Sequence, residues 1–182
     1  TAASQDCPWV LPWPTDRDGK TPIGVVFMHV AGREHKAGGG IWNAEEVGAI
    51  DGVVDLLETW NFDLAKLGIV AMYNGQVAEL RERLGDRLPP DSFSTVDGFQ
   101  GQERDLIIVS LARSNKSRAC GFSTRPQRLN VAFSRAKLGL LVCGDLRQFY
   151  YGDQFGDLLG FHRNSVPARV HRGRALEHLE WY

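Results

Sequence analysis

The sequence contains few residues of the kinds that crosslink a chain or bind a metal. Among its 182 residues are three cysteines and five histidines. Cys7, Cys120 and Cys143 lie far apart and form no C-x-x-C pair, so the sequence predicts neither a zinc ribbon nor a disulfide framework. The histidines have no spacing typical of a metal site. We therefore expect free thiols, a reducing compartment and no bound metal.

Long apolar runs and a strong charge of one sign are also missing. No stretch approaches the roughly 18 apolar residues of a membrane-spanning helix, and no signal-peptide pattern is present. We expect an intracellular protein, cytoplasmic or nuclear, without a membrane partner. The formal net charge is −1, so a nucleic-acid site would have to be a local basic patch. The chain starts at Thr1 rather than at a methionine, and we expect it to be part of a longer protein.

A phosphate-binding loop is missing, although residues 14–21 come close to one. PTDRDGKT shares its last three residues with G-x-x-x-x-G-K-[ST], but it begins with a proline. No credible strand precedes it, and Pro22 follows where the motif must open a helix. We predict a surface turn here, within an irregular, proline-rich lead-in at residues 1–22.

From residue 23 onward, apolar strand patterns alternate with helical patterns. Strands are predicted at 23–30, 67–72, 93–96, 105–111 and 138–144, and helices at 43–60, 75–84 and 126–136. Asn43 is the expected N-cap of the first helix. Because several strands are apolar throughout, they favour a parallel sheet covered on both faces. The sequence therefore predicts a three-layer α/β domain at 23–182, with functional segments directly after its strands.

Two segments carry specific motifs. STVDGFQGQERDLIIVSLARSN covers residues 94–115, and RPQRLNVAFSRAKLGLLVCGD covers 125–145. They resemble motifs V and VI of superfamily 1 helicases of the up-frameshift-like, Sen1-like and immunoglobulin-mu-binding type. IVAMYNGQVAEL (69–80) resembles motif IV, although Ala71 and Met72 replace the usual Thr-Pro. NAEEV (43–47) resembles the acidic start of that family's first helix in this domain.

This resemblance implies that the chain is the second, C-terminal RecA-like domain of a helicase motor, a fold of the P-loop NTPase type that here lacks the phosphate loop. Arg135 would be the arginine finger that completes an ATP site from the neighbouring domain. Glu103 would orient the ribose or the water around the metal, and Arg128 would contact phosphate or hold motif VI against the sheet. The implied nucleotide-binding residues are Gly101, Gln102, Glu103, Tyr73, Gln76 and Arg135. ATP and Mg²⁺ would be bound mainly by a first RecA-like domain.

The implied substrate is single-stranded RNA or DNA, and the sequence leaves the choice between them open. The hydroxyls of Ser94 and Thr95 suit backbone phosphates, and Gln100 would link the nucleotide and strand sites. Seven Lys and Arg but no acid lie between Arg113 and Lys137, which predicts a basic surface, and the helix at 126–136 is expected to present Arg135 at a fixed angle. Further candidates for strand contact are Arg113, Ser114 and Asn115.

The predicted function is therefore the C-terminal motor domain of an ATP-dependent helicase, inactive as an ATPase by itself. Its expected partners are the first RecA-like domain of the same polypeptide and proteins of an RNA-processing complex. One alternative is a non-catalytic nucleic-acid-binding or scaffold domain derived from a helicase, which the presence of Arg135 and Glu103 disfavours. The other is a free-standing nucleotide-binding enzyme, but AGREHKAGGG after the first strand lacks G-x-G-x-x-G.

Overall fold

A computed structural model describes residues 24–38, 40–121 and 125–150 of the chain. The lead-in predicted at residues 1–22, with its turn at 14–21, lies outside these ranges, as does the part after residue 150. Within the described ranges, no helix is long and apolar enough to cross a membrane.

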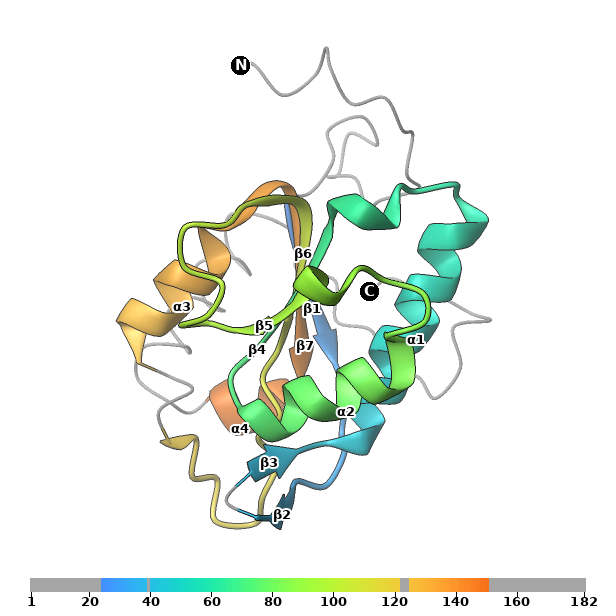
Figure 1. Cartoon of the computed structure of the whole chain (residues 1–182). Helices are drawn as coiled ribbons and strands as arrows, with labels where there is room; N and C mark the ends of the chain where they lie inside the picture. The colour runs from blue at the N-terminus through green and yellow to red at the C-terminus, as the bar shows by residue number, and fades with distance from the viewer. Residues whose placement is uncertain (1–23, 39, 122–124, 151–182) are drawn as a thin grey trace, which may run out of the picture.

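Five parallel strands form the central sheet (Figure 1). From one edge to the other they are β1 (Val25–His29), β7 (Ala136–Gly144), β6 (Arg104–Ser110), β4 (Leu67–Ala71) and β5 (Phe93–Thr95). The three central strands are almost entirely buried where they pair, as expected of strands covered on both faces. The predicted parallel sheet is thereby confirmed.

Helices cover both faces of this sheet. Helices α1 (Ala44–Thr59) and α2 (Asn74–Leu84) lie on one face, whereas α3 (Pro126–Phe133) and the segment 96–103 lie on the other (Figure 1). Each face has its own buried apolar cluster. The predicted three-layer α/β fold is therefore confirmed. The short helical elements are η1 (Leu64–Lys66), η2 (Pro90–Ser92) and α4 (Leu146–Tyr150).

Helix α1 begins where its capping residue predicts. The Asn43 side chain accepts a hydrogen bond from the Glu46 backbone N–H at 3.2 Å, which satisfies one of the free donors of the first turn. The apolar residues at helical spacing all face the core: Val47, Ile50, Val54 and Leu57. Local sequence thus determined both the start of this helix and the face that it buries.

Two predictions of local structure were wrong. The glycine-rich segment after β1 is not a plain loop, because it forms the antiparallel hairpin β2 (His35–Ala37) and β3 (Gly40–Trp42). The helix expected at 126–136 ends at Phe133. Arg135 lies in a turn, where its backbone carbonyl accepts a hydrogen bond from Arg104 at 3.1 Å, and Ala136 already pairs with β6. Pairing with β6 thus overrides the helical pattern of these residues.

Candidate functional site: two edges of a motor domain

The predicted functional residues lie at the two opposite ends of the strands. All five strands are parallel, so their amino ends meet along one side of the sheet, here called the amino edge, and their carboxyl ends meet along the other, the carboxyl edge. Glu103 and Arg135 precede β6 and β7, which places them at the amino edge. Tyr73 and Arg113 follow β4 and β6 and lie at the carboxyl edge. The expectation that all functional segments directly follow strands was therefore wrong for the pair with the strongest implied catalytic roles.

The segment 96–103 leads from the carboxyl end of β5 to the amino end of β6 (Figure 1). Phe99 holds it against the sheet with a side chain that is completely buried. Gly101 has a φ of 82°, a backbone conformation that favours glycine, and the next residue closes the turn by donating from Gln102 N to the Phe99 carbonyl at 3.1 Å. The F-Q-G-Q-E pattern thus combines an anchor, a turn and two polar residues at the amino edge.

Arg135 lies between this segment and the end of α3. Its guanidinium donates to the carbonyl of Val131 at 3.1 Å, to the carbonyl of Gln102 at 3.5 Å and to the Ser134 hydroxyl at 2.9 Å. The side chain is half-buried at the amino edge and is not turned into the core. Because these three acceptors are uncharged, they orient the guanidinium without neutralising it.

Two charged pairs involve residues of the segment 96–103. Glu103 is exposed and lies 4.0 Å from the ammonium of Lys137, measured from Oε2 to Nζ. Arg128 forms an ion pair and hydrogen bond with Asp97, which joins α3 to the segment 96–103. This contact favours the role of holding motif VI in place over direct phosphate contact. The amino-edge site comprises Gly101, Gln102, Glu103 and Arg135, whereas Arg128 lies at the start of α3, the end of that helix away from Arg135.

The predicted strand-contacting residues of β5 face the turn that follows it. Ser94 and Thr95 are half-buried, and the Thr95 hydroxyl accepts from the Gly98 N–H at 3.3 Å. A Cβ added to Gly98 would come within 2.4 Å of Ser94 Oγ, so a larger residue here would require the Ser94 hydroxyl to move. Gln100 is exposed.

At the carboxyl edge, Arg113 has internal partners. Only 7% of it is exposed, and its Nε donates to Glu34 Oε2 at 2.8 Å. Nη1 donates to the Tyr73 hydroxyl at 3.2 Å. Burial raises the pKa of Glu34, but hydrogen bonds from Asn115, Lys36 and Arg113 outweigh it and hold that pKa below its usual value. The charge of Arg113 is therefore balanced by an ionised carboxylate inside the protein.

The two residues after Arg113 also form hydrogen bonds inside the domain. The Ser114 hydroxyl donates to Asp145 Oδ2 at 2.9 Å, and Asn115 Nδ2 donates to Glu34 Oε2 at 2.9 Å. These contacts connect the segment after β6 to β7 and to the hairpin. A role of Arg113, Ser114 and Asn115 in strand binding remains a prediction, and the structure gives each of them an internal contact as well.

Sequence reasoning missed a buried polar network between the two helices and β6. Gln76 is completely buried, accepts from Asn43 N at 2.7 Å and donates to Ser110 Oγ at 2.9 Å. Ser110 Oγ in turn donates to Glu46 Oε2 at 2.6 Å, and the Ala112 N–H donates to the same oxygen at 2.9 Å. Gln76 and Tyr73 therefore lie inside the protein at the carboxyl edge, away from Arg135. The sequence contained one signal of this network: Glu46 lies in the first turn of α1, on the same face of the helix as its buried apolar residues.

Glu46 has no cationic partner among these contacts. Burial raises the pKa of this carboxyl to about 8 from its usual value of 4.5, although hydrogen bonds from Ser110 and the Ala112 backbone lower it. Folding therefore favours the protonated acid in the neutral range.

We expect Glu46→Gln to remove a pH dependence of stability. The favourable contribution of Glu46 is complete below about pH 4.5 and is lost as the pH rises to about 8. Relative to Glu46→Gln, the wild-type free energy of unfolding should fall across this window by up to about 1.4 kcal/mol per pH unit. Urea titrations at pH 5, 6.5 and 8 measure it, with the exposed Glu45→Gln as control. Parallel profiles of wild type and Glu46→Gln would contradict the expectation.

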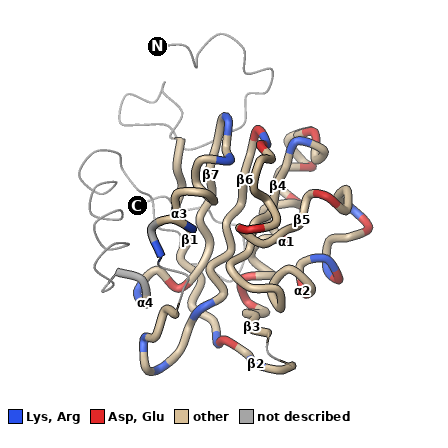
Figure 2. Tube along the Cα trace, turned by 60° about the vertical axis from the view of Figure 1, so that its left-hand side comes forward, with Lys and Arg blue, Asp and Glu red and all other residues tan. Residues whose placement is uncertain are grey.

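The basic residues between Arg113 and Lys137 do not form one continuous surface. Figure 2 shows separate groups of basic residues at the upper and the lower end of the molecule. Arg135 and Lys137 belong to the amino edge, whereas Lys116 and Arg118 are exposed in the loop after β6 at the carboxyl edge. The chain passes from the carboxyl end of β6 to the amino end of β7 between these residues, and so it places them at opposite ends of the domain.

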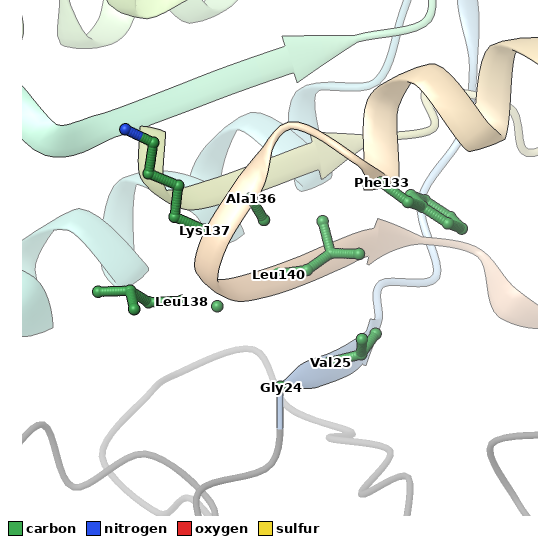
Figure 3. A pocket seen from close by; sticks show the side chains of 8 residues that line it. Gly24, Val25, Phe133, Ala136, Lys137, Leu138 and Leu140 are labelled. Carbon is green, nitrogen blue, oxygen red and sulfur yellow. The ribbon is translucent and has the colours of Figure 1, made fainter. Parts of the chain in front are cut away.

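An apolar hollow of about 340 Å³ lies beside the amino-edge site. The side chains of Val25, Phe133 and Leu140 line it in Figure 3, and Lys137 and Leu138 lie at its rim. Leu138 is 42% exposed. The amino edge thus presents apolar surface as well as charge.

Comparison with known proteins identifies the family. Residues 3–147 match the model of a family described as an AAA domain. The chain is 33% identical over 150 residues to the DNA polymerase alpha-associated DNA helicase A of Saccharomyces cerevisiae, which covers 78% of the chain and 22% of that protein. It is 32% identical over 163 residues to the regulator of nonsense transcripts 1 homolog of Drosophila melanogaster, covering 85% of the chain and 13% of the relative. With the helicase sen1 of Schizosaccharomyces pombe the identity is 35% over 127 residues, or 65% of the chain and 8% of that protein.

The chain therefore spans less than a quarter of the length of the relatives that it matches. The matched region contains both specific motif segments and all five strands of the central sheet. The α/β fold, the paired motif segments at the amino edge and these relatives agree: the chain is a helicase-derived domain that belongs to the up-frameshift-like family of superfamily 1 helicases.

Proposed function

We propose that this domain is the second RecA-like half of an ATP-dependent helicase motor and that Arg135 is its arginine finger. ATP and Mg²⁺ are bound mainly by the first RecA-like domain of the same polypeptide, as the family resemblance implies. Closure of the two halves brings the amino edge to the γ-phosphate. By itself the domain hydrolyses essentially no ATP.

The observation that carries this proposal is the environment of Arg135. Its guanidinium is held by two carbonyls and one hydroxyl, and these acceptors leave its positive charge available to a phosphate. A guanidinium held in advance loses less freedom when charge develops on the transferring phosphoryl group. Arg128 supports this position indirectly, because its pair with Asp97 holds α3 to the segment that carries Gln102.

Glu103 has the second role in the proposed site. Its carboxylate is exposed beside Lys137, so it is accessible to a ribose hydroxyl or to water around a metal ion. Gly101 and Gln102 bring the backbone of the same turn to the nucleotide. The apolar hollow and Leu138 are adjacent, and we propose that the facing domain covers them when the halves close.

The substrate of the motor is a single strand of nucleic acid. Two relatives are named ATP-dependent helicases, NAM7 of Saccharomyces cerevisiae and upf1 of Schizosaccharomyces pombe. Other relatives are named a DNA helicase and regulators of nonsense transcripts, so both DNA and RNA belong in the test. We propose that Ser94, Thr95 and Gln100 contact the strand backbone, and that protein partners come from an RNA-processing complex.

The test is ATP hydrolysis by the full-length protein with and without single strands. RNA and DNA oligonucleotides of equal length are compared. We expect at least one of them to raise the rate of ATP hydrolysis well above the rate without a strand. The isolated domain should show no hydrolysis above background. A full-length protein that binds single strands without any ATP turnover would instead support the alternative, a non-catalytic scaffold derived from a helicase.

A further inference from the structure

The β2–β3 hairpin carries an aromatic pair on its outer face. His35 and Trp42 are paired in register, and their rings stack with centroids 5.5 Å apart and planes at 21°. On the opposite face of the hairpin, Ile41 packs against the apolar core. His35 is exposed and Trp42 is half-buried. The stacked pair therefore faces away from the core, although packing is the ordinary expectation for a tryptophan.

This hairpin is held firmly to the carboxyl edge of the domain (Figure 1). Glu34 N donates to the Ser114 carbonyl at 3.0 Å, and the Glu34 carboxylate receives the Arg113 and Asn115 side chains. At its other strand, a Cβ added to Gly75 would come within 2.8 Å of the Ile41 carbonyl, so β3 lies directly on the start of α2. The aromatic pair is thus mounted on a rigid support.

Exposed cations lie on the hairpin segment and on the loop after β6. Arg33 precedes His35 by two residues, and Lys116 and Arg118 belong to the loop after β6, which binds Glu34. Lys36 is also exposed, but it is paired in register with Ile41, on the face opposite to the aromatic pair, and its ammonium lies 3.1 Å from the Glu34 carboxylate. The acids nearby are Glu34, whose side chain is only 5% exposed within its ion pairs; Asp145, at 15%; and Glu45, an exposed residue near Gly32. The exposed charge around the pair is therefore mostly positive, in a chain of net charge −1.

We propose that this hairpin surface, consisting of Arg33, His35, Trp42, Lys116 and Arg118, binds single-stranded nucleic acid by stacking an unpaired base on the His35–Trp42 pair. The inference rests on the proposed helicase function and adds a contact surface that lies outside the motif segments. Arg33, Lys116 and Arg118 bind phosphates of the same strand.

The chemistry favours a single strand over other anionic partners. An aromatic face contributes by stacking only when a base is unpaired, and such stacking accepts every base. A duplex buries the faces of its bases, and an acidic peptide would need the cations but not the aromatic pair. The combination of a stacked, outward-facing pair with exposed Lys and Arg is therefore most useful to a strand that carries both bases and phosphates.

The test measures the affinity of the full-length protein for fluorescein-labelled 15-nucleotide oligo(dT) and oligo(U). Trp42→Ala should weaken binding by about tenfold or more, because one base can no longer stack. Trp42→Phe should recover most of the affinity, since it retains a ring. The double variant Arg33→Ala/Lys116→Ala should reduce the slope of log affinity against log salt by about 1.4, or about 0.7 for each phosphate that the protein no longer neutralises.

Matched controls separate this surface from general damage. Trp60→Ala removes another half-buried tryptophan, at the far end of α1, and Lys66→Ala removes a partly exposed lysine next to β4's amino end, where it pairs with Asp105. Both should leave affinity and salt slope unchanged. Equal binding by Trp42→Ala and Trp60→Ala would overturn the inference. Competition by polyglutamate that equals that of the oligonucleotide and is independent of Trp42 would also overturn it, in favour of an acidic protein partner.

The same measurements distinguish this inference from the proposed function. A wild-type protein whose ATP hydrolysis does not respond to any single strand contradicts the helicase proposal as a whole. A wild-type protein with strand-stimulated hydrolysis, but with the same strand affinity as Trp42→Ala, contradicts only the hairpin surface.

Discussion

Replacing Arg135 by alanine in the full-length protein is expected to slow strand-stimulated ATP hydrolysis by about 10³–10⁵-fold, the effect of losing an arginine finger. The physical reason is that the guanidinium of Arg135 would stabilise the negative charge that develops on the transferring phosphoryl group, and alanine cannot. Strand affinity without nucleotide should be retained, because Arg135 lies at the edge opposite to the hairpin. Single-turnover hydrolysis and oligonucleotide binding by the same preparation measure both quantities.

Two further variants sharpen this result. Arg135→Lys keeps a charge but lacks the planar fork that can form two hydrogen bonds, so it should recover only part of the rate. Arg83→Ala removes an exposed arginine whose partner is Asp51, on the helical face away from Arg135, and should hydrolyse ATP at the wild-type rate. Turnover of Arg135→Ala within about threefold of wild type would remove this residue from the ATP site.

Replacing Phe99 by alanine should cost about 3–5 kcal/mol of unfolding free energy, the usual effect of emptying a buried aromatic site. Phe99 is completely buried between the sheet and the segment 96–103, and its ring lies near Gly68, where an added Cβ would come within 2.7 Å of it. Its backbone also donates to the Thr95 carbonyl at 2.9 Å, which fixes the start of the turn. Urea unfolding of the variant measures the loss.

The matched control for this variant is Phe133→Ala. Phe133 is only half-buried, at the wall of the apolar hollow, so the same substitution should cost clearly less. If the two variants lose the same free energy, Phe99 is not the anchor of the segment. If Phe99 is the anchor, Phe99→Ala should also lower strand-stimulated ATP hydrolysis, because the Gln102 carbonyl is then no longer held in position to bind Arg135.

Long-range contacts explain most of the errors made from the sequence. The helical pattern extends α3 three residues too far, because the pairing of Ala136 with β6 involves a strand some thirty residues earlier in the chain. The glycine-rich sequence of the hairpin is typical of a loop. Its strands pair because the hairpin is held by contacts with Ser114 and Gly75, which lie far away in the sequence. The binding role of Gln76 stays a prediction, and the structure adds a contact that the sequence did not indicate, because the side chain is buried between Asn43 and Ser110.

By itself the sequence determined the parallel α/β architecture, the N-cap of α1, the motif segments and the family. These features depend on local patterns: apolar runs long enough to be covered on both faces, a capping asparagine, and residue spacings within one segment. Only the tertiary structure decided which predicted residues meet. It joined Gln102 to Arg135 at the amino edge, paired Arg113 with Glu34 at the other, and exposed the His35–Trp42 pair. Such contacts join residues far apart in the chain, so they depend on how the strands are ordered in the sheet.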